Sequence, residues 1–248
     1  MARSSIVKEI SNPIKMGIYE TSSTLPDGGR LGMKLTLDDG RVFQLAKAGA
    51  SGLSAGYMCQ SVAPVANHTS LAITQAQAIG DTTVTVTLGG TAVAANDYLW
   101  GTLHVSDGLA GGTGYKIQSH LAQATTSGNV VINIYDGLSV AIDTTSKGTL
   151  TYNPFQATIA CVYGGLTASV CGIPLVPVTA LYYYWSQTKG LCPAYTIGTV
   201  VIGQPVGLGG TTAGACGPIT AYTTAVWGTT VHVNATTKFS LINLKLDI

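Results

Sequence analysis

Residues 33–45 read Met-Lys-Leu-Thr-Leu-Asp-Asp-Gly-Arg-Val-Phe-Gln-Leu, which is two alternating arms around an Asp-Gly pair. Apolar side chains at every second position indicate a strand with one buried face, and Asp-Gly between two such runs is a turn signal of a β-hairpin. Residues 82–88 repeat the alternation as Thr-Thr-Val-Thr-Val-Thr-Leu. These two stretches predict an all-β chain.

Further short strands are predicted along the whole chain, separated by Gly, Asn or Pro. Glu, Lys, Arg and Gln are scarce, whereas Thr, Val, Tyr, Ile and Gly are frequent, so helices are disfavoured. The one helix-like stretch, residues 46–57, contains three glycines and is predicted to be a loop or a very short turn. Many short strands predict a β-sandwich or a barrel-like fold. The remaining strand candidates are residues 98–105, 115–120, 129–135, 148–152, 157–163, 175–187, 198–203, 230–233 and 239–246.

Charge is distributed unevenly and suggests the domain organisation. Seven of the twelve basic residues fall within the first 47 positions, and no Lys or Arg lies between Ala48 and Tyr115. We expect residues 1–30 to form an extended N-terminal arm that lies on a neighbouring subunit, although a solvated leader fits the composition equally well. Residues 31–153 are expected to form a β-rich domain. Residues 154–248, with an aromatic strand at 181–187, form either a second one or its continuation.

The overall composition predicts a protein that works in an assembly. Charged residues make up 9% of the chain, against about 25% in an average soluble domain. The net charge of +1 encodes no general attraction to nucleic acid or to anionic membranes. No run is long enough for a membrane span, and the first 20 residues lack the apolar run of a secretory signal. We therefore expect synthesis in the cytoplasm, no nucleic-acid or membrane partner, and a homo-oligomer.

Carboxylates are missing from a large part of the chain. The only glutamates are Glu9 and Glu20, and no Asp or Glu occurs from Thr144 to Leu246. General acid–base pairs and Mg²⁺ or Ca²⁺ sites depend on these side chains. The sequence therefore predicts a protein that is not an enzyme, with no catalytic residues, no cofactor and no metal site.

Motifs that could carry chemistry are incomplete. The Gly-rich stretch 108–116 is not a phosphate-binding loop, because Tyr115 separates Gly114 from Lys116. His104 and His120 could face each other across a hairpin near Asp107, and we interpret them as a polar cross-strand pair in preference to a metal or acid–base site. Linear order alone does not exclude a Ser/His/Asp arrangement, but no GxSxG elbow is present.

Cysteines are odd in number and form no CxxC pair. Structural zinc sites need closely spaced pairs, so we predict small buried thiols in preference to a metal or disulfide role. The five are Cys59, Cys161, Cys171, Cys192 and Cys216.

Residues 182–185, Tyr-Tyr-Tyr-Trp, are the most distinctive local feature. On a strand, Tyr182 and Tyr184 would lie on one face and Tyr183 and Trp185 on the other, so the strand is either buried on both sides or part of an interface. Stacking on sugars or bases is the functional alternative. The predicted interface residues are Arg3, Lys8, Lys15, Tyr182, Tyr184 and Trp185.

Several of these segments together resemble structural proteins of the tailed-bacteriophage capsid surface. In such proteins an aromatic strand that ends in a Trp-x-Gln-x-x-Gly turn is followed by small-residue segments that pack over it. The resemblance covers roughly residues 30 to 248, and the cysteines depart from the usual pattern. It is carried by 39–43 (DGRVF), 48–50 (AGA), 55–57 (AGY), 180–190 (ALYYYWSQTKG), 201–206 (VIGQPV) and 212–214 (TAG).

The resemblance implies a head decoration, or cement, protein located on the virion capsid surface. Such a subunit is β-rich, is commonly a trimer, binds the major capsid protein and clamps neighbouring capsomers. A phage tail or fibre subunit, or a carbohydrate-binding β-domain, is the alternative, although no fixed-period repeat of the kind expected in fibres is present. A hydrolase of similar β architecture would need a carboxylate beside a histidine, with Asp81, Asp97, Asp107, Asp136 and Asp143 as the candidates.

Overall fold

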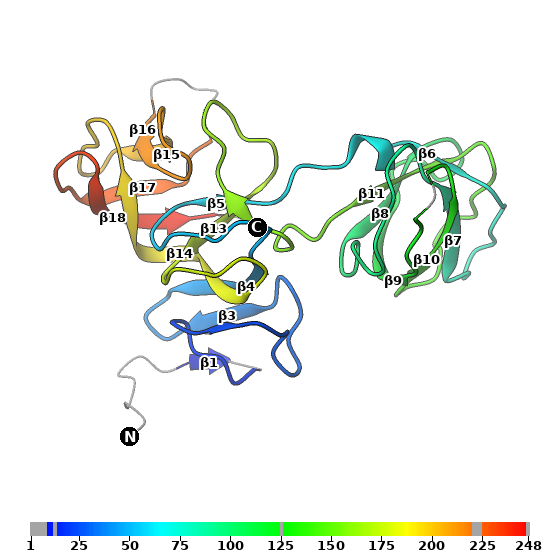
Figure 1. Cartoon of the computed structure of the whole chain (residues 1–248), viewed down its shortest axis with the longest axis horizontal. Helices are drawn as coiled ribbons and strands as arrows, with labels where there is room; N and C mark the ends of the chain where they lie inside the picture. The colour runs from blue at the N-terminus through cyan, green and yellow to red at the C-terminus, as the bar shows by residue number, and fades with distance from the viewer. Residues whose placement is uncertain (1–8, 12–13, 125, 220–224, 247–248) are drawn as a thin grey trace. The chain divides into compact units, whose positions relative to one another are not determined.

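The computed structural model describes residues 9–11, 14–124, 126–219 and 225–246. The fold is all-β, as predicted, and the only helix within those ranges is a single 3-10 turn, η1 (Ala66–His68). The chain forms two compact units (Figure 1). We name residues 1–62 with 154–248 the base unit and residues 63–153 the barrel unit.

The barrel unit is a closed six-stranded barrel in the order β10-β7-β6-β11-β8-β9. Side chains alternate between core and solvent along most of its strands, since each strand has one inner and one outer face. Its core gathers the inward Val, Ile and Leu side chains around the fully buried Tyr98. The strands are β6 (Leu71–Ile73), β7 (Thr83–Thr87), β8 (Thr102–Asp107), β9 (Gly114–His120), β10 (Asn129–Ile134) and β11 (Lys147–Thr151).

The base unit is organised around one long strand, β14 (Tyr183–Thr196). Its first half pairs with β4 (Val42–Lys47), which pairs with β3 (Lys34–Leu37) as the predicted hairpin, and β3 pairs with β1 (Glu9–Ser11). β2 (Thr21–Ser22) also pairs with β14. Ile14 and Met16 belong to the core beneath this sheet. Residues 14–30 therefore pack within the base unit, and residues 1–8 of the expected arm lie outside the described ranges.

The second half of β14 belongs to a small ring of strands. It pairs with β18 (Lys238–Lys245) and, through Thr196, with β16 (Cys216–Pro218). β15 (Pro205–Leu208) joins β16 to β17 (Gly228–His232), and β17 returns to β18, so the five strands close on themselves. The interior holds a second core that includes Trp227 and Cys192.

Three short strands lie where the chain leaves and re-enters the base unit. β5 (Cys59–Gln60) pairs with both β12 (Ile159–Ala160) and β13 (Val170–Pro174), and β13 pairs with β14. The barrel unit is thus an insertion between two strands, β5 and β12, that pair with each other. The structure divides the chain differently from the expected halves: a division does fall after Asn153, but residues 31–62 belong with 154–248.

Several predicted strands need correction. Residues 198–203 form no strand, whereas β15 begins at Pro205 and was not predicted. The predicted strand 175–187 merges two features, because residues 175–182 are a loop and β14 continues to Thr196. Residues 98–100 form a turn before β8, and only Ile159 and Ala160 of the predicted 157–163 are in a strand. Residues 48–57 contain no helix, as predicted.

Candidate functional site

The aromatic run lies at the start of β14 and is mostly buried. Tyr184 is 0% exposed and Trp185 is 1% exposed. The Tyr184 hydroxyl forms a 2.9 Å hydrogen bond with Thr158 Oγ1, and Trp185 Nε1 donates to the Met16 carbonyl at 2.8 Å. The prediction that Tyr184 and Trp185 are interface residues is therefore wrong, because both are core residues, and neither is placed to stack on a sugar or base.

The other predicted interface residues are scattered. Tyr182 precedes β14 and is half-buried. Lys15 is exposed and lines an open hollow of about 640 Å³ together with Glu20 and Asp27. Arg3 and Lys8 lie outside the described residues. Among the described members of this set, only Lys15 and the half-buried Tyr182 therefore reach the surface.

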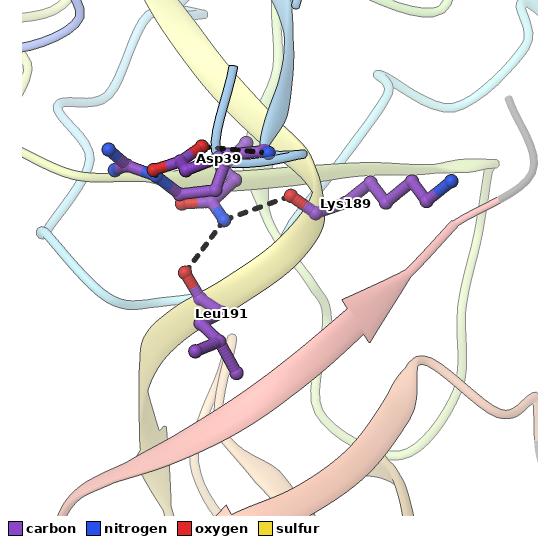
Figure 2. A network of polar contacts seen from close by, with 5 residues as sticks. Asp39, Lys189 and Leu191 are labelled. Atoms are coloured by element: carbon purple, nitrogen blue, oxygen red, sulfur yellow. Dashed lines mark hydrogen bonds and ion pairs between the residues drawn. The ribbon is translucent and has the colours of Figure 1, made fainter. Parts of the chain in front are cut away.

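A β-bulge marks the point where β14 passes from one sheet partner to the other. The register with β4 shifts between Gln187 and Lys189, and Lys189 is also the first residue paired with β18. The buried Gln187 side chain donates through Nε2 to the carbonyl oxygens of Lys189 and Leu191, each at 3.0 Å, as Figure 2 shows. This amide holds the bulge, which is a common device for re-aiming side chains. Beyond it, every second residue of β14 points outward.

The outward residues of β14 and β18 form a four-rung ladder, which we name the outer ladder. Its rungs are the cross-strand pairs Lys189 with Lys245, Leu191 with Asn243, Pro193 with Leu241, and Tyr195 with Phe239. Leu191 is 51% exposed and Phe239 is 46% exposed. The intervening residues, such as Cys192 and Ile242, face the core of the ring.

Aromatic rings cover the last rung. The rings of Tyr57 and Tyr195 stack with centroids 4.7 Å apart and an interplanar angle of 12°. Phe239 packs its ring against both, at 5.5 Å from Tyr195 and 6.2 Å from Tyr57. Such pairs add stabilisation beyond area burial. The aromatic end of the outer ladder is therefore a rigid, partly exposed platform.

Sequence reasoning predicted the strand 239–246 but not this surface. Phe239 and Leu241 point outward while Ile242 and Leu244 point inward, so apolar residues occupy both faces of β18. A polar outer face is the usual pattern for a sheet with one solvated side. The sequence signal that could have revealed this surface is that residues 239–246 lack a regular alternation of polar and apolar side chains.

The barrel histidines are not a facing pair. His104 lies opposite Gly114, and His120 lies opposite Ile132, so the predicted cross-strand pair is wrong by register. His120 Nε2 accepts a hydrogen bond from the Tyr98 backbone N–H at 3.0 Å, and its Nδ1 donates to the Leu121 carbonyl at 3.0 Å. His120 thus uses both ring nitrogens in hydrogen bonds to the barrel backbone.

His68 has a similar role in the barrel core. Its Nε2 donates to the Thr91 carbonyl at 2.9 Å, and its Nδ1 accepts from the Tyr98 hydroxyl at 2.6 Å. Tyr98 in turn stacks on Tyr152 with ring centroids 4.4 Å apart. Burial raises the pKa of Tyr98 far above its ordinary value. His68, Tyr98 and Tyr152 therefore stabilise the barrel core through these hydrogen bonds and ring contacts.

All five cysteine thiols are buried, as predicted, and none is paired. Burial raises the pKa of Cys59 and of Cys192 to about 12, and it also raises the pKa values of Cys161, Cys171 and Cys216 well above the ordinary value. A thiol with a raised pKa is protonated and unreactive at neutral pH. The thiols therefore act as small apolar residues of the base unit.

Among the described residues, no group of three or more His, Cys, Asp or Glu side chains is placed to hold a metal ion. Likewise, no described helix is long and apolar enough to cross a membrane.

Comparison with known proteins adds no relative. No protein-family model matches the chain, and no curated protein or solved structure matches it.

Proposed function

We propose that this chain is a non-enzymatic structural protein of a virion, a decoration or cement protein that binds the outer surface of a tailed-phage capsid. It is made in the host cytoplasm, assembles as a homo-oligomer, with a trimer favoured, and stabilises contacts between capsomers through the major capsid protein. No cofactor, nucleic acid or membrane is part of this proposal.

The observation that carries the proposal is the outer ladder. Large apolar side chains on a sheet held by paired strands form a preorganised surface, which reduces the entropy lost on docking. The exposed Leu191 and Phe239 lie on adjacent strands with Pro193 and Leu241 between them. A surface of this kind is typical of a protein–protein contact.

The segments of the capsid-protein resemblance support the same role. Trp185, Gln187 and Gly190 of the Trp-x-Gln-x-x-Gly pattern lie around the bulge of β14. The small-residue segments that follow lead into β15 and β16, which contribute Val206 and Cys216 to the ring core beside β14. The pattern therefore coincides with the framework of the outer ladder.

Add-back to capsids tests the proposal. Full-length protein is sized by light scattering, mixed with tailed-phage capsids that lack it, and sedimented with them. We expect a small closed oligomer that binds to saturation at a fixed ratio to the capsid protein. A monomer that stays in the supernatant at every concentration contradicts the proposal.

A carbohydrate-binding role is the second candidate, because the barrel unit carries an aromatic pair on its surface. Trp100 Nε1 donates to the Tyr135 hydroxyl at 3.1 Å, Tyr135 is 46% exposed, and Trp100 has a left-handed backbone with φ of 59°. Strained bulky residues concentrate at functional sites, and aromatic faces stack on sugars. If this role holds, titration with bacterial cell-wall oligosaccharides should quench part of the tryptophan fluorescence of the wild type. The fluorescence of a Trp100→Phe variant, which keeps the buried Trp185 and Trp227, should not change in the same titration.

A further inference from the structure

We infer that the outer ladder docks onto a carboxylate-rich protein surface, with its lysine rung against acidic side chains and its aromatic end against apolar groups. The inference rests on the proposed function, since it names the attachment face and the chemistry of the capsid surface that receives it.

The lysine rung is unfavourable in the isolated chain. Lys189 and Lys245 lie directly opposite each other on β14 and β18, and both are exposed. Like charges directly opposite on a sheet are destabilising. Among the described residues the one ion pair is Arg41 with Asp39, so no described carboxylate forms an ion pair with either lysine of the rung. An acidic partner would convert this repulsion into attraction.

The strands β14, β17 and β18 themselves carry no carboxylate. Asp38 and Asp39 lie in the turn before β4, which pairs with β14 at Lys189, and Asp39 is already paired with Arg41. From Thr144 to Leu246, which includes all of β14, β17 and β18, the chain contains no Asp or Glu. Asp247 lies outside the described residues. The base unit as a whole has ten basic and six acidic residues in the sequence. Charge complementarity therefore favours a partner that supplies the missing negative charge.

A second copy meeting the same face is a poorer occupant. Two outer ladders placed face to face would bring four lysines and no described carboxylate into one contact. Like-charge juxtaposition across an interface disfavours that partner. The same argument applies in any symmetric arrangement of the face on itself, since an isologous contact uses one patch twice.

The aromatic end provides the apolar half of the contact. Tyr57, Tyr195 and Phe239 fix one another by ring packing, so little side-chain freedom is lost when they are covered. Aromatic residues are enriched in the centres of interfaces, whereas the surrounding rim is polar and solvent-accessible. The ladder has this order along its length, with the lysines at one end and the rings at the other.

The test uses charge variants in the full chain and capsids that lack the protein. The ladder variant is Lys189→Glu with Lys245→Glu. Its control, Lys34→Glu with Lys116→Glu, makes the same charge change at exposed residues of β3 and β9. We expect the ladder variant to bind capsids about tenfold or more weakly than wild type and the control to bind within about twofold. Wild-type binding should weaken with rising salt.

A second pair of variants keeps the test independent of folding. Lys189→Gln with Lys245→Gln removes the like-charge pair, so thermal stability should be unchanged or higher while capsid binding falls. A purely structural role of the lysines would not give this combination. Leu191→Ser should also weaken binding, whereas Leu121→Ser, at a barrel residue that is 83% exposed, should not.

The outcomes are distinguishable. Wild-type protein that fails to bind capsids overturns the proposed function and this inference with it. Wild-type binding that survives all ladder variants overturns the inference and leaves the function standing. A drop in oligomer mass in the ladder variants shows that the face joins copies of this chain, which also overturns the inference.

Discussion

The barrel unit and the base unit both have an all-β core, but their strands are buried in different ways. In the barrel, each strand has one core face and one solvent face, so burial alternates along β7, β9 and β10. In the base unit, residues 184–188 of β14 are buried on both faces. The strands of the small closed barrel can therefore be recognised from their local alternation. The central strand β14 cannot, because its burial depends on the several strands that pair with it and pack on it.

The two units also differ in titratable chemistry. The barrel unit has five aspartates, two lysines and no cysteine, whereas the base unit has all five cysteines and most of the basic residues. Because all five buried thiols lie in the base unit, we expect it to be the more alkali-sensitive half of the chain.

Alkaline pH should give the largest difference between the units. Burial raises the pKa of Cys59 from 9.0 to about 12, and the other four thiols shift in the same direction. The unfolded chain releases these protons first, so this stability is fully present below about pH 9 and is lost as the pH rises towards 12. The loss is about 1.4 kcal/mol per thiol at pH 10, and five thiols together exceed the effect of a single substitution.

Urea unfolding at pH 8 and pH 10, followed by pulse proteolysis and mass spectrometry, measures the two units separately. Peptides of the base unit should become sensitive at a lower urea concentration at pH 10. Burial also raises the pKa values of Tyr98 and Tyr152 in the barrel, so its stability should begin to fall only above pH 10. Equal shifts in both units would contradict the thiol account.

Removing one core aromatic from each unit should unfold that unit selectively. Tyr98→Ala leaves a cavity in the barrel and an unpartnered His68 Nδ1, and Trp185→Ala leaves a cavity under β14. Each should cost about 3–5 kcal/mol. Hydrogen exchange followed by mass spectrometry should show lost protection in the mutated unit alone. Loss in both units from either variant would show that they fold as one cooperative body.

Two glycines with nearly equal φ angles allow the cost of strain to be compared with the cost of crowding. Gly190 of β14 has φ of 90°, and an added Cβ would lie 2.9 Å from Arg41 Cγ and 3.1 Å from Arg41 Cα. Gly112 of the barrel has φ of 91° and nothing within 4 Å of such an atom. Gly112→Ala should cost about 1 kcal/mol from strain, and Gly190→Ala about 2–3 kcal/mol. If both variants shift the urea midpoint of their unit by the same amount relative to wild type, crowding by Arg41 does not contribute to the cost at Gly190.

The smallest effect concerns two alanines with left-handed backbones. Ala157, in the base unit, has φ of 51°, and Ala110, in the barrel, has φ of 66°. Glycine accepts this conformation freely, so Ala157→Gly should stabilise by about 0.5 kcal/mol. Ala110 packs against the barrel core and loses its methyl contact, so Ala110→Gly should be near neutral. Differential scanning calorimetry measures the change in unfolding temperature of each variant relative to wild type.

The sequence alone predicts those strands whose burial follows from their own pattern of apolar and polar residues. The hairpin of β3 and β4 and the strands β7, β9, β10 and β11 follow from alternation and turn residues. The buried thiols follow from the lack of paired cysteine spacing. These features depend on local chemistry, so a single sequence reveals them.

The rest depends on pairings between distant segments. The extension of β14 to Thr196 requires the bulge held by Gln187, and the ring requires β18 to return beside β14. The burial of Tyr184 and Trp185 requires Thr158 and Met16, which lie 26 and 169 residues away in the sequence. The outer ladder arises from two strands whose register cannot be read locally, which explains why it was missed as a candidate site.

The most direct test of the central claim is an electron cryomicroscopy map of capsids mixed with the full-length protein. The account predicts added density on the outer capsid surface, with β14 and β18 turned towards the major capsid protein and the ladder rungs, from Lys189 and Lys245 to Tyr195 and Phe239, at the contact. A map with no added density, or with density that turns the outer ladder to solvent, would contradict it.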